Sequence, residues 1–382
     1  MVQDELRIFC PEVITPEGQI SGDVIVREGR IIAVEPRASA GKGVLDWSGD
    51  TLIAGLVDIH TDNFEKHYQP RPGALWDAYG AALAQDGQCA SAGITTVLDS
   101  LALHGSKDGL DRKTALAPMI EAMDAAAKDG ALRADHLLHL RCEVTNPELM
   151  DLVAPFRDHP KLRLLSVMDH TPGQRQVSDV GRMQRNLAEA GHSAEEISNM
   201  MTFRFEGRDP SVAIENRRKV VTIAKETGEP LAAHDDATLD HVDEAHRDGC
   251  TISEFPVTIA AARRARELGM MNAMGGPNFV RGSSHSGNLS ARACAEADLL
   301  DIIASDYVPM SMLRSAFLLI SLMGWAPEKA MATVSVNPAR SVGLRDRGEI
   351  APGQRADLLR VSRGAQGWPT PKEVWREGMR VA

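Results

Sequence analysis

Short apolar runs alternate with stretches of helical spacing through the middle of the chain. Eight runs have the length of buried strands, at 55–60, 94–99, 136–143, 163–169, 230–234, 250–254, 270–274 and 301–305. Between some of them, apolar residues recur every three or four positions, at 115–128, 213–226 and 257–268. Strands that alternate with helices in this number predict an α/β fold, a distorted TIM (β/α)8 barrel. An open doubly wound sheet is the alternative, but no GxGxxG motif follows the first strand.

The two ends of the chain show a different pattern. Apolar runs at 24–26 and 31–34 flank a turn at Glu28-Gly29 and predict a hairpin, and 348–350 with 356–361 predict a second one. We therefore expect both termini to form one small discontinuous β-sandwich domain over 1–52 and 346–382, with the barrel at 53–345. The polar segment 173–210 is either a lid over the active face or a helical hairpin on the outside.

Acidic residues and histidines stand at the ends of five of the predicted strands. They are His60, Asp62, Glu143, His170, His234 and Asp306. One such histidine alone is more often an ordinary hydrogen-bonding residue, but in a barrel all strand ends open on one face, where these side chains would converge. Imidazole nitrogens and carboxylate oxygens suit zinc, manganese or magnesium, and the two oxygens of Glu143 could bridge two ions. The pattern predicts metal-dependent hydrolysis.

Composition excludes several classes of function. The 382 residues are 43% hydrophobic, enough for a large core, and carry a net charge of −11. An acidic chain argues against general binding of nucleic acids or anionic membranes. No uncharged apolar run approaches the roughly 20 residues of a membrane span. Five scattered cysteines without a CxxC pair favour reduced thiols and a cytoplasmic location.

Several motifs resemble a known family. Residues 53–60 resemble the first barrel strand of the amidohydrolase superfamily, and 337–358 resemble its return to the β domain. Longer motifs resemble the phosphonate-metabolism diphosphatases of that superfamily, at 60–67, 70–73, 169–176, 234–238, 253–256, 274–278, 281–288 and 305–307.

This resemblance implies an activity. It is the hydrolysis of α-D-ribose 1-methylphosphonate 5-triphosphate to the 5-phosphate and pyrophosphate, in the carbon–phosphorus lyase pathway. The resemblance implies two divalent ions on the six residues above, with Asp306 also moving a proton. One position departs from the superfamily, whose first strand usually carries His-x-His where this chain has His60 and Asp62. A carboxylate there favours manganese or magnesium over zinc, or weakens one site.

A ribose triphosphate bound to an acidic protein needs a local cationic pocket. Three strand-end loops offer candidates, the last of them a glycine-rich loop after the seventh strand: Lys66, His67 and Arg71; Arg175; Arg281, Ser283, Ser284, His285 and Asn288. Arginine forks bind phosphate oxygens in pairs, and glycines let backbone amides approach an anion. The alternative for each residue is a solvated or salt-bridged surface position.

Three further acids near the strand ends have two interpretations each. Glu254 either hydrogen-bonds a ligand histidine or forms an ordinary salt bridge. Asp235 and Asp236 either shape the pocket or cap the next helix. At the level of function, a C–N bond hydrolase (a cyclic amidase or deaminase) and a metal-poor, non-catalytic scaffold stay open beside the diphosphatase. We expect a small-molecule substrate and a homodimer.

Overall fold

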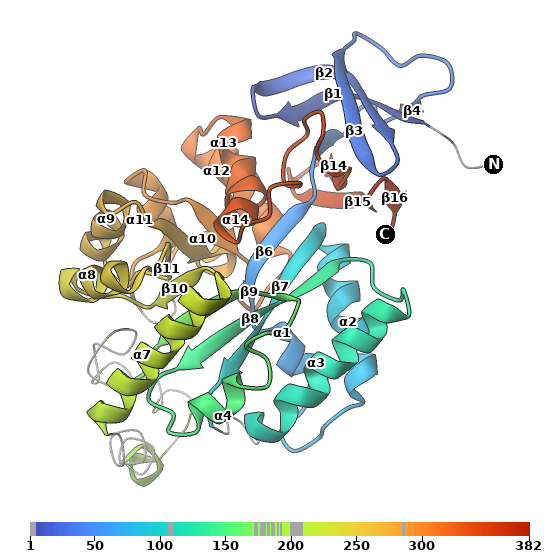
Figure 1. The fold of residues 1–382 in the computed structure, drawn as a ribbon. Coiled ribbons are helices and arrows are strands. Elements are labelled where there is room, and N and C mark those ends of the chain that lie inside the picture. Colours follow the sequence, from blue (N-terminus) through green and yellow to red (C-terminus); the bar gives the residue numbers. More distant parts are fainter. Residues whose placement is uncertain are drawn as a thin grey trace.

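A nearly closed barrel of eight parallel strands forms the centre of the molecule (Figure 1). The structure is a computed structural model that describes residues 5–382 except for 106–109, 172–174, 176–180, 182–183, 185–187, 189–190, 192, 199–208 and 285–286. In hydrogen-bonded order the barrel strands are β6 (Leu56–Thr61), β7 (Ile94–Leu103), β8 (Asp135–Glu143), β9 (Leu162–Met168), β10 (Leu231–His234), β11 (Ile252–Glu254), β12 (Met271–Gly275) and β13 (Ile302–Ala304). The predicted fold class is confirmed.

The eight predicted runs correspond to these eight strands, because strands buried on both faces consist of nearly continuous apolar residues. The largest difference is in β7, which continues to Leu103 where the prediction ended at 99. All ten residues of β7 are buried, and polar Asp99 and Ser100 are held by hydrogen bonds inside the fold. Polar residues therefore interrupt the apolar pattern of β7 without ending the strand.

The barrel closes at the ends of its first and last strands. Thr61 and Asp306 form a parallel bridge between β6 and the segment after β13. The backbone N–H of Asp62 donates to the carbonyl of Asp306 at 2.7 Å, and the N–H of Asp306 donates to the carbonyl of His60 at 2.9 Å. The backbone that completes the barrel is therefore the backbone that carries three of the predicted site residues.

Helices follow the strands and cover the outside of the barrel (Figure 1). They are α1 (Asn63–Tyr68), α2 (Ala78–Ser91), α3 (Arg112–Lys128), α4 (Leu149–Val153), α7 (Pro210–Thr227), α8 (Leu239–Asp248), α9 (Ile259–Glu267), α10 (Gly276–Arg281), α11 (Ala291–Glu296), α12 (Ser311–Met323), α13 (Pro327–Ala332) and α14 (Val336–Ser341). Side-chain caps fix several starts, as at Asp209, which accepts from Ser211 N–H ahead of α7. The predicted helical stretches are α3, α7 and α9. No helix in the described ranges is long and apolar enough to cross a membrane.

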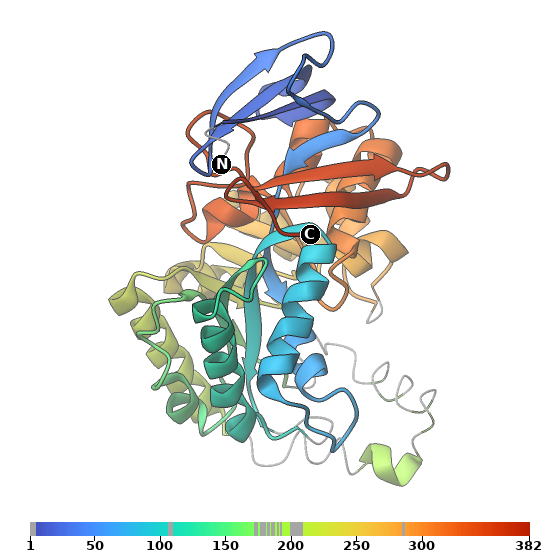
Figure 2. The same ribbon diagram turned by 90° about the vertical axis from the view of Figure 1, so that its right-hand side faces the viewer.

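Strands from both ends of the chain pair into one additional sheet (Figure 2). Its members are β1 (Leu6–Thr15), β2 (Gly18–Arg27), β3 (Arg30–Pro36), β4 (Leu45–Asp46), β5 (Thr51–Ala54), β14 (Leu358–Arg363), β15 (Pro369–Arg376) and β16 (Met379–Arg380). Antiparallel β5 and β14 join the N-terminal strands to the C-terminal ones. Because β5 leads directly into the start of β6, this sheet lies at the end of the barrel where the strands begin, opposite their carboxyl ends. The boundaries 1–52 and 346–382 stay our proposal for this unit.

One of the two predicted hairpins is placed differently. The turn between β2 and β3 lies at Glu28 and Gly29, both with positive φ. Residues 348–350, however, are not a strand, and the C-terminal hairpin consists of β14 and β15. Gly348 has a φ of +92°, and a Cβ there would lie 2.8 Å from the Cα of Val336. This residue is therefore a tight turn against α14. The segment 173–210 lies largely outside the described residues, so both interpretations of it stay predictions.

Candidate metal centre

Histidines and carboxylates from different strands come together at the barrel's open end. In the described part of the chain, three groups of such residues each place one ligand atom per residue within 4.8 Å of the others, and two of these groups contain the predicted ligands from more than one strand. The first, here named the β6–β13 cluster, comprises His60, Asp62 and Asp306. The second, here named the β9–β10 cluster, comprises His170, His234 and Asp235. Five of the six residues predicted as ligands therefore belong to one cluster or the other.

Glu254 connects the two clusters from below. Its Oε1 lies 2.6 Å from Nδ1 of His60, and its Oε2 lies 2.7 Å from Nδ1 of His234. All three side chains are buried, and the two imidazole rings stack with centroids 5.6 Å apart. With Nδ1 occupied, each ring presents Nε2 to its cluster. Of the two interpretations of Glu254, the structure supports the carboxylate that orients ligand histidines.

The same contacts shift the pKa values of this group. Burial alone would raise the pKa of Glu254, but the charge of His60 and hydrogen bonds from His234 and His60 hold it well below its usual range. Burial lowers the pKa of His60, but the charge of Glu254 together with hydrogen bonds to Asp62 and Glu254 outweighs burial and raises the value to about 10. Without a metal ion, His60 therefore carries a proton that ligation would have to remove.

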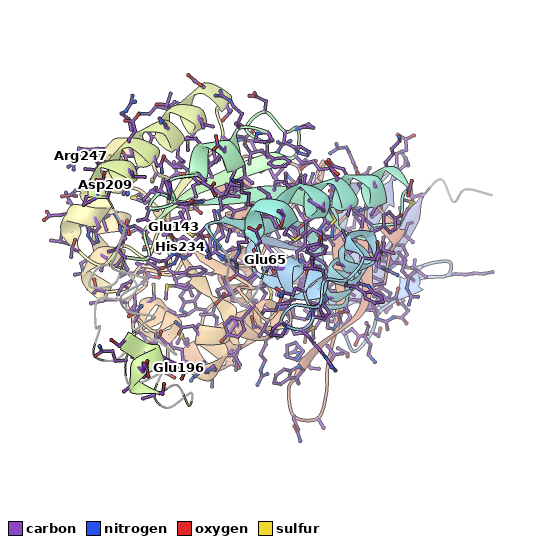
Figure 3. All side chains as sticks on the ribbon, turned by 90° about the horizontal axis from the view of Figure 1, so that it is seen from below. Glu65, Glu143, Glu196, Asp209, His234 and Arg247 are labelled. Carbon is purple, nitrogen blue, oxygen red and sulfur yellow. The ribbon has the colours of Figure 1, made fainter. Side chains whose placement is uncertain are left out.

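Glu143 has the corresponding position behind His170. Its Oε2 lies 2.6 Å from Nδ1 of His170, and its Oε1 accepts from Thr145 Oγ1 at 2.5 Å and from the His170 N–H at 3.2 Å. Figure 3 shows Glu143 and His234 inside the ring of helices, whereas Asp209 and Arg247 lie at the periphery. Both oxygens of Glu143 are thus engaged in orienting His170. A bridge between two ions, as predicted, would require these hydrogen bonds to rearrange.

Asp235 was not among the predicted ligands. Its Oδ2 lies 3.2 Å from Nε2 of His234 and 3.7 Å from Nε2 of His170, and is buried without a hydrogen-bond partner in the described structure. The N-cap of α8 is Thr238, so neither Asp235 nor Asp236 caps that helix. Asp235 has a φ of +60° and Asp306 one of +54°, a backbone conformation that costs energy for a residue with a Cβ. The backbones of Asp235 and Asp306 are thus strained, just beyond the ends of β10 and β13.

Arg141 is a second site residue that the sequence analysis missed. It lies on β8 two residues before Glu143, so both side chains point to the same side of the strand. Its guanidinium is buried and contacts Oδ1 of Asp62 through Nη1. Burial would raise the pKa of Asp62, but the charges of Arg141 and His60 hold it well below its usual range. The alternation along β8 is the signal that could have revealed this residue.

Asp306 has a different electrostatic environment. Burial comes first in raising the pKa of its carboxyl, and repulsion from Asp62 raises it further. His60, Arg141 and His234 oppose that shift. The backbone next to it is close, because a Cβ on Gly275 would lie 3.1 Å from Oδ2 of Asp306. A carboxylate in this setting takes up a proton more readily than an exposed aspartate does.

His139 belongs to a third group, but both of its ring nitrogens have other hydrogen-bond partners. With His60 and Glu254 it places ligand atoms within 4.8 Å of one another. Its Nδ1 lies 3.0 Å from the carbonyl of Ile59, and its Nε2 lies 2.8 Å from Ser166 Oγ. Burial lowers the pKa of His139 to about 3, so the ring is neutral. We interpret His139 as packing beneath the two clusters.

The predicted phosphate-binding residues lie in several environments. Exposed Lys66 has its Nζ 3.2 Å from Asn63 Oδ1 and 5.4 Å from the ring centroid of Tyr307, which follows Asp306. His67 is partly buried, with its Nε2 2.9 Å from Gln88 Oε1. Exposed positions are Arg71, Arg281 and Ser283, and partly buried ones are Ser284 and Asn288. His285 lies outside the described residues.

Arg175 has carboxylate partners in the structure. It is buried, contacts Asp236 through Nη1, and places Nη2 3.3 Å from Glu244 Oε2. A phosphate could reach this guanidinium only in competition with Asp236. The contact identifies Asp236 as the buried counter-charge of Arg175, and because Thr238 is the N-cap of α8, the capping interpretation of Asp236 is wrong.

The segment after the seventh strand is partly helical. We expected a glycine-rich loop there, but residues 276–281 form α10, with a proline at its start and Gly282 at its end. Gly282 has a φ of +79°, the left-handed conformation that commonly ends a helix. The backbone carbonyls of Phe279 and Val280 accept from Arg292 at 2.8 Å each. Of the described residues beyond Gly282, Ser283, Ser284, Gly287 and Asn288 lie outside helices and strands.

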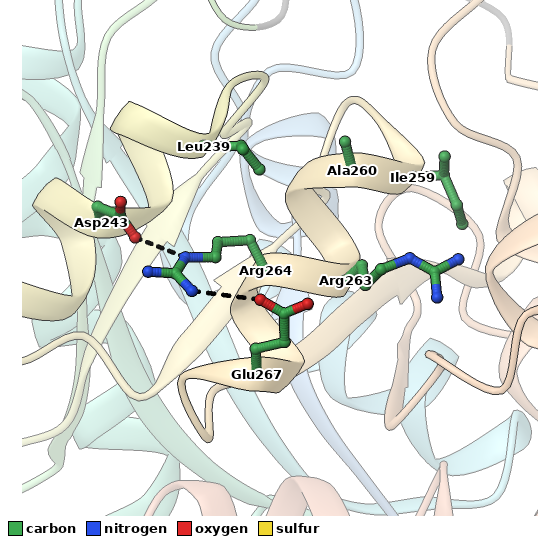
Figure 4. Close-up of a pocket in the computed structure, with 7 residues that line it drawn as sticks. All are labelled: Leu239, Asp243, Ile259, Ala260, Arg263, Arg264 and Glu267. Carbon is green, nitrogen blue, oxygen red and sulfur yellow. Dashed lines mark hydrogen bonds and ion pairs between the residues drawn. The ribbon is translucent and has the colours of Figure 1, made fainter.

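A groove on the outside of the barrel is separate from these clusters. It lies between α8 and α9 (Figure 4), with a volume of about 490 Å³. Arg264 crosses it, 2.7 Å from Asp243 and 3.2 Å from Glu267. Its lining residues include none of the predicted site residues.

The two clusters fit divalent ions by the chemistry of their donors. Three Nε2 atoms, each fixed by a carboxylate on Nδ1, face three aspartates, and one aspartate oxygen is buried without a hydrogen bond. Oriented imidazoles with nearby carboxylates are ligands of zinc and manganese.

Comparisons with known proteins agree with this geometry. The chain is 37% identical over 368 residues to the α-D-ribose 1-methylphosphonate 5-triphosphate diphosphatase of Escherichia coli, covering 95% of this chain and 96% of that protein. The structure resembles 5-methylcytosine deaminase from Klebsiella pneumoniae, with a TM-score of 0.67, 14% identity, and 99% and 98% of the two chains covered. It also resembles N-acetyl-D-glucosamine-6-phosphate deacetylase from Mycobacterium smegmatis, with a TM-score of 0.66, 16% identity, and 99% and 100% covered. At these identities the structural likeness shows the fold alone.

Residues 51–378 match the amidohydrolase family, a span that includes the whole barrel and strands β5, β14 and β15 of the additional sheet. The resemblance inferred from the motifs is thereby confirmed. This chain belongs to the amidohydrolase family.

Proposed function

We propose that this protein is a metal-dependent diphosphatase that converts α-D-ribose 1-methylphosphonate 5-triphosphate to the 5-phosphate and pyrophosphate. The observation that carries the proposal is the convergence of three oriented histidines and three aspartates at the barrel's open end. The likeness to the Escherichia coli diphosphatase along nearly the whole chain supports the choice of substrate.

We propose that the β6–β13 and β9–β10 clusters hold up to two divalent ions, zinc, manganese or magnesium. The ligands would be His60, Asp62, His170, His234, Asp235 and Asp306, with Glu143 behind His170. Ions bound there would supply positive charge to the phosphoryl oxygens and make a nearby water more acidic. Glu254 would keep two of the imidazoles in the tautomer with Nδ1–H, leaving Nε2 unprotonated for ligation.

In the proposed reaction, water attacks the phosphorus nearest the ribose. The oxygen of water forms a new P–O bond, the bond from that phosphorus to the bridging oxygen breaks, and pyrophosphate leaves. Asp306 accepts the proton of the attacking water, a role favoured by the place of its carboxylate in the β6–β13 cluster beside His60 and Asp62. Charge on the phosphoryl oxygens would be met by the cationic and polar residues around the opening: Lys66, His67, Arg71, Arg175, Arg281, Ser283, Ser284, His285 and Asn288.

A product assay tests the proposal directly. The purified protein is incubated with the ribose 5-triphosphate that bears a 1-methylphosphonate, with manganese or zinc, and phosphorus is followed by NMR. We expect signals of pyrophosphate and the 5-phosphate to rise together in equal amounts. Release of orthophosphate instead, or no turnover with either metal, would exclude this reaction.

A C–N bond hydrolase is the second candidate, because the same metal clusters could serve amide or amidine hydrolysis and the fold resembles a deaminase and a deacetylase. Ammonia release from cyclic amides and aminated bases would support it. A metal-poor scaffold is the third candidate, and elemental analysis of protein purified without chelator would distinguish it from a metal-dependent enzyme.

We place the reaction in the cytoplasm, since all five cysteines are buried free thiols, as a reducing compartment maintains.

A further inference from the structure

A cationic side chain lies inside one of the two clusters. The guanidinium of Arg141, with 10% of its side chain exposed, contacts Asp62 through Nη1. Its Nε is buried and has no hydrogen-bond partner in the described structure. Asp62 is also 3.5 Å from Nε2 of His60, within the β6–β13 cluster. This cluster therefore contains its own counter-charge in the form of Arg141.

Among the described residues, the β9–β10 cluster has no such partner. Asp235 contacts His234 and His170, and none of its ion pairs among the described residues involves a lysine or an arginine. Its Oδ2 is buried without a hydrogen bond. A buried carboxylate oxygen in that state is costly unless a cation or a donor satisfies it.

We propose that the two clusters bind divalent ions unequally, and that Arg141 sets the difference. The β9–β10 cluster is the tight site. An ion that enters the β6–β13 cluster must draw Asp62 away from a buried guanidinium and then stay close to that positive charge. Both effects weaken binding, and because 38% of the Asp62 side chain is exposed, water screens part of each. The inference rests on the metal dependence in the proposed function but needs no substrate.

Metal binding by the metal-free protein tests the proposal. After chelation and dialysis, wild type, Arg141→Gln and Arg347→Gln are titrated with Mn²⁺ in a calorimeter, and the ions retained after gel filtration are counted by mass spectrometry. Arg347 is the matched control, because it is a similarly buried arginine (11% exposed) that pairs with Asp135 at 2.7 Å at the opposite end of the barrel.

We expect wild type and Arg347→Gln to bind one ion tightly and a second one weakly. In Arg141→Gln the second ion should bind at least about tenfold more tightly, which corresponds to 1.4 kcal/mol. In the double variant Arg141→Gln with Asp62→Asn the gain should disappear, because the proposal assigns the effect of Arg141 to Asp62. Arg141→Lys keeps the charge and should stay within a few-fold of wild type.

Two outcomes would overturn the inference. One is a wild-type protein that binds two ions with equal affinity, a result that needs no variant to fold. The other is an Arg141→Gln protein whose second ion binds as in wild type. A protein that binds no ion at all would overturn the metal dependence as well. If ions bind as expected but the ribose triphosphate is not hydrolysed, the proposed substrate fails and the inference about Arg141 stands.

Discussion

Two buried groups of histidines and carboxylates lie in this barrel, and they differ in how their atoms are used. In the metal centre, Glu254 holds His60 and His234 by Nδ1, and both Nε2 atoms face aspartates that can reorient toward an ion. In the second group, beneath α2, His136 lies between two buried aspartates. Its Nδ1 is 2.8 Å from Asp99 Oδ2, and its Nε2 is 3.4 Å from Asp86 Oδ1.

The carboxylates of the second group are already satisfied. Asp86 accepts from the backbone N–H groups of Arg133 at 2.7 Å and Ala134 at 2.9 Å, and from the Arg133 guanidinium at 3.0 Å. The other oxygen of Asp99 accepts from Gln85 at 3.0 Å. No oxygen is left for an ion, so we interpret this group as a structural ion cluster. The comparison shows that residue type and burial are not enough to identify a metal site, which also requires carboxylate oxygens without a fixed partner, such as Oδ2 of Asp235.

Of the changes that distinguish the two groups, Asp306→Asn should have the largest effect, and that effect should be on turnover. The amide cannot accept the proton of the attacking water, so turnover should fall by about 100- to 10,000-fold. Pyrophosphate release measures the loss, and circular dichroism with metal analysis checks the fold and the bound ions. Asp99→Asn is the matched control from the structural cluster and should keep turnover within a few-fold. Near-normal turnover of Asp306→Asn would remove the proton-accepting role.

The next effect is on stability. His136→Gln leaves Asp86 and Asp99 buried without the charge between them, which should lower the free energy of unfolding by about 3 kcal/mol. Urea denaturation followed by fluorescence measures the change. Metal stoichiometry should be unaltered, because this group does not touch the metal centre. Loss of bound metal from a folded His136→Gln protein would contradict the division into two groups.

Glu254→Gln should have a smaller effect, and on metal affinity instead of on stability. The amide can accept from only one of the two imidazoles, so the other loses the partner that fixes its tautomer. Metal affinity should fall by about 10- to 100-fold. Competition with a coloured chelator measures the affinity. A Glu254→Gln protein that binds metal as tightly as wild type would show that the histidines are oriented by other contacts.

The sequence predicted the fold, and it predicted five of the six residues that the structure brings into the two clusters, for the same physical reason. Strands buried on both faces are continuous apolar runs. A polar residue at the carboxyl end of such a run therefore lies at the open end of the barrel. Partners across strands were beyond this reasoning. Glu254 meets His234 because β10 and β11 pair in a register that sets these two residues side by side. His60 reaches the same carboxylate from the first barrel strand, 194 residues away.

The residues missed were those whose role depends on a partner. Arg141 and Asp235 stand next to predicted ligands, but a sequence does not show that a guanidinium will reach Asp62 or that an aspartate will turn toward His170. Arg175 is the opposite case: it was predicted to bind phosphate, but in the structure it lies beside two carboxylates. In each case, three-dimensional packing decides the partner.

The smallest expected effect is a dependence of stability on pH. Burial lowers the pKa of His136, but Asp99 and Asp86 outweigh it and raise the value to about 9, above the ordinary histidine value of 6.5. A histidine whose pKa is higher in the folded state stabilises the fold fully below pH 6.5, and this contribution is lost as the pH rises through 9. The stability advantage of wild type over His136→Gln should therefore shrink by about 1 kcal/mol per pH unit in that window. Urea denaturation of both proteins from pH 6 to pH 9 measures the difference, which cancels groups common to both. An advantage that stays constant over this range would mean that His136 is neutral, and that a hydrogen bond rather than a charge joins the two aspartates.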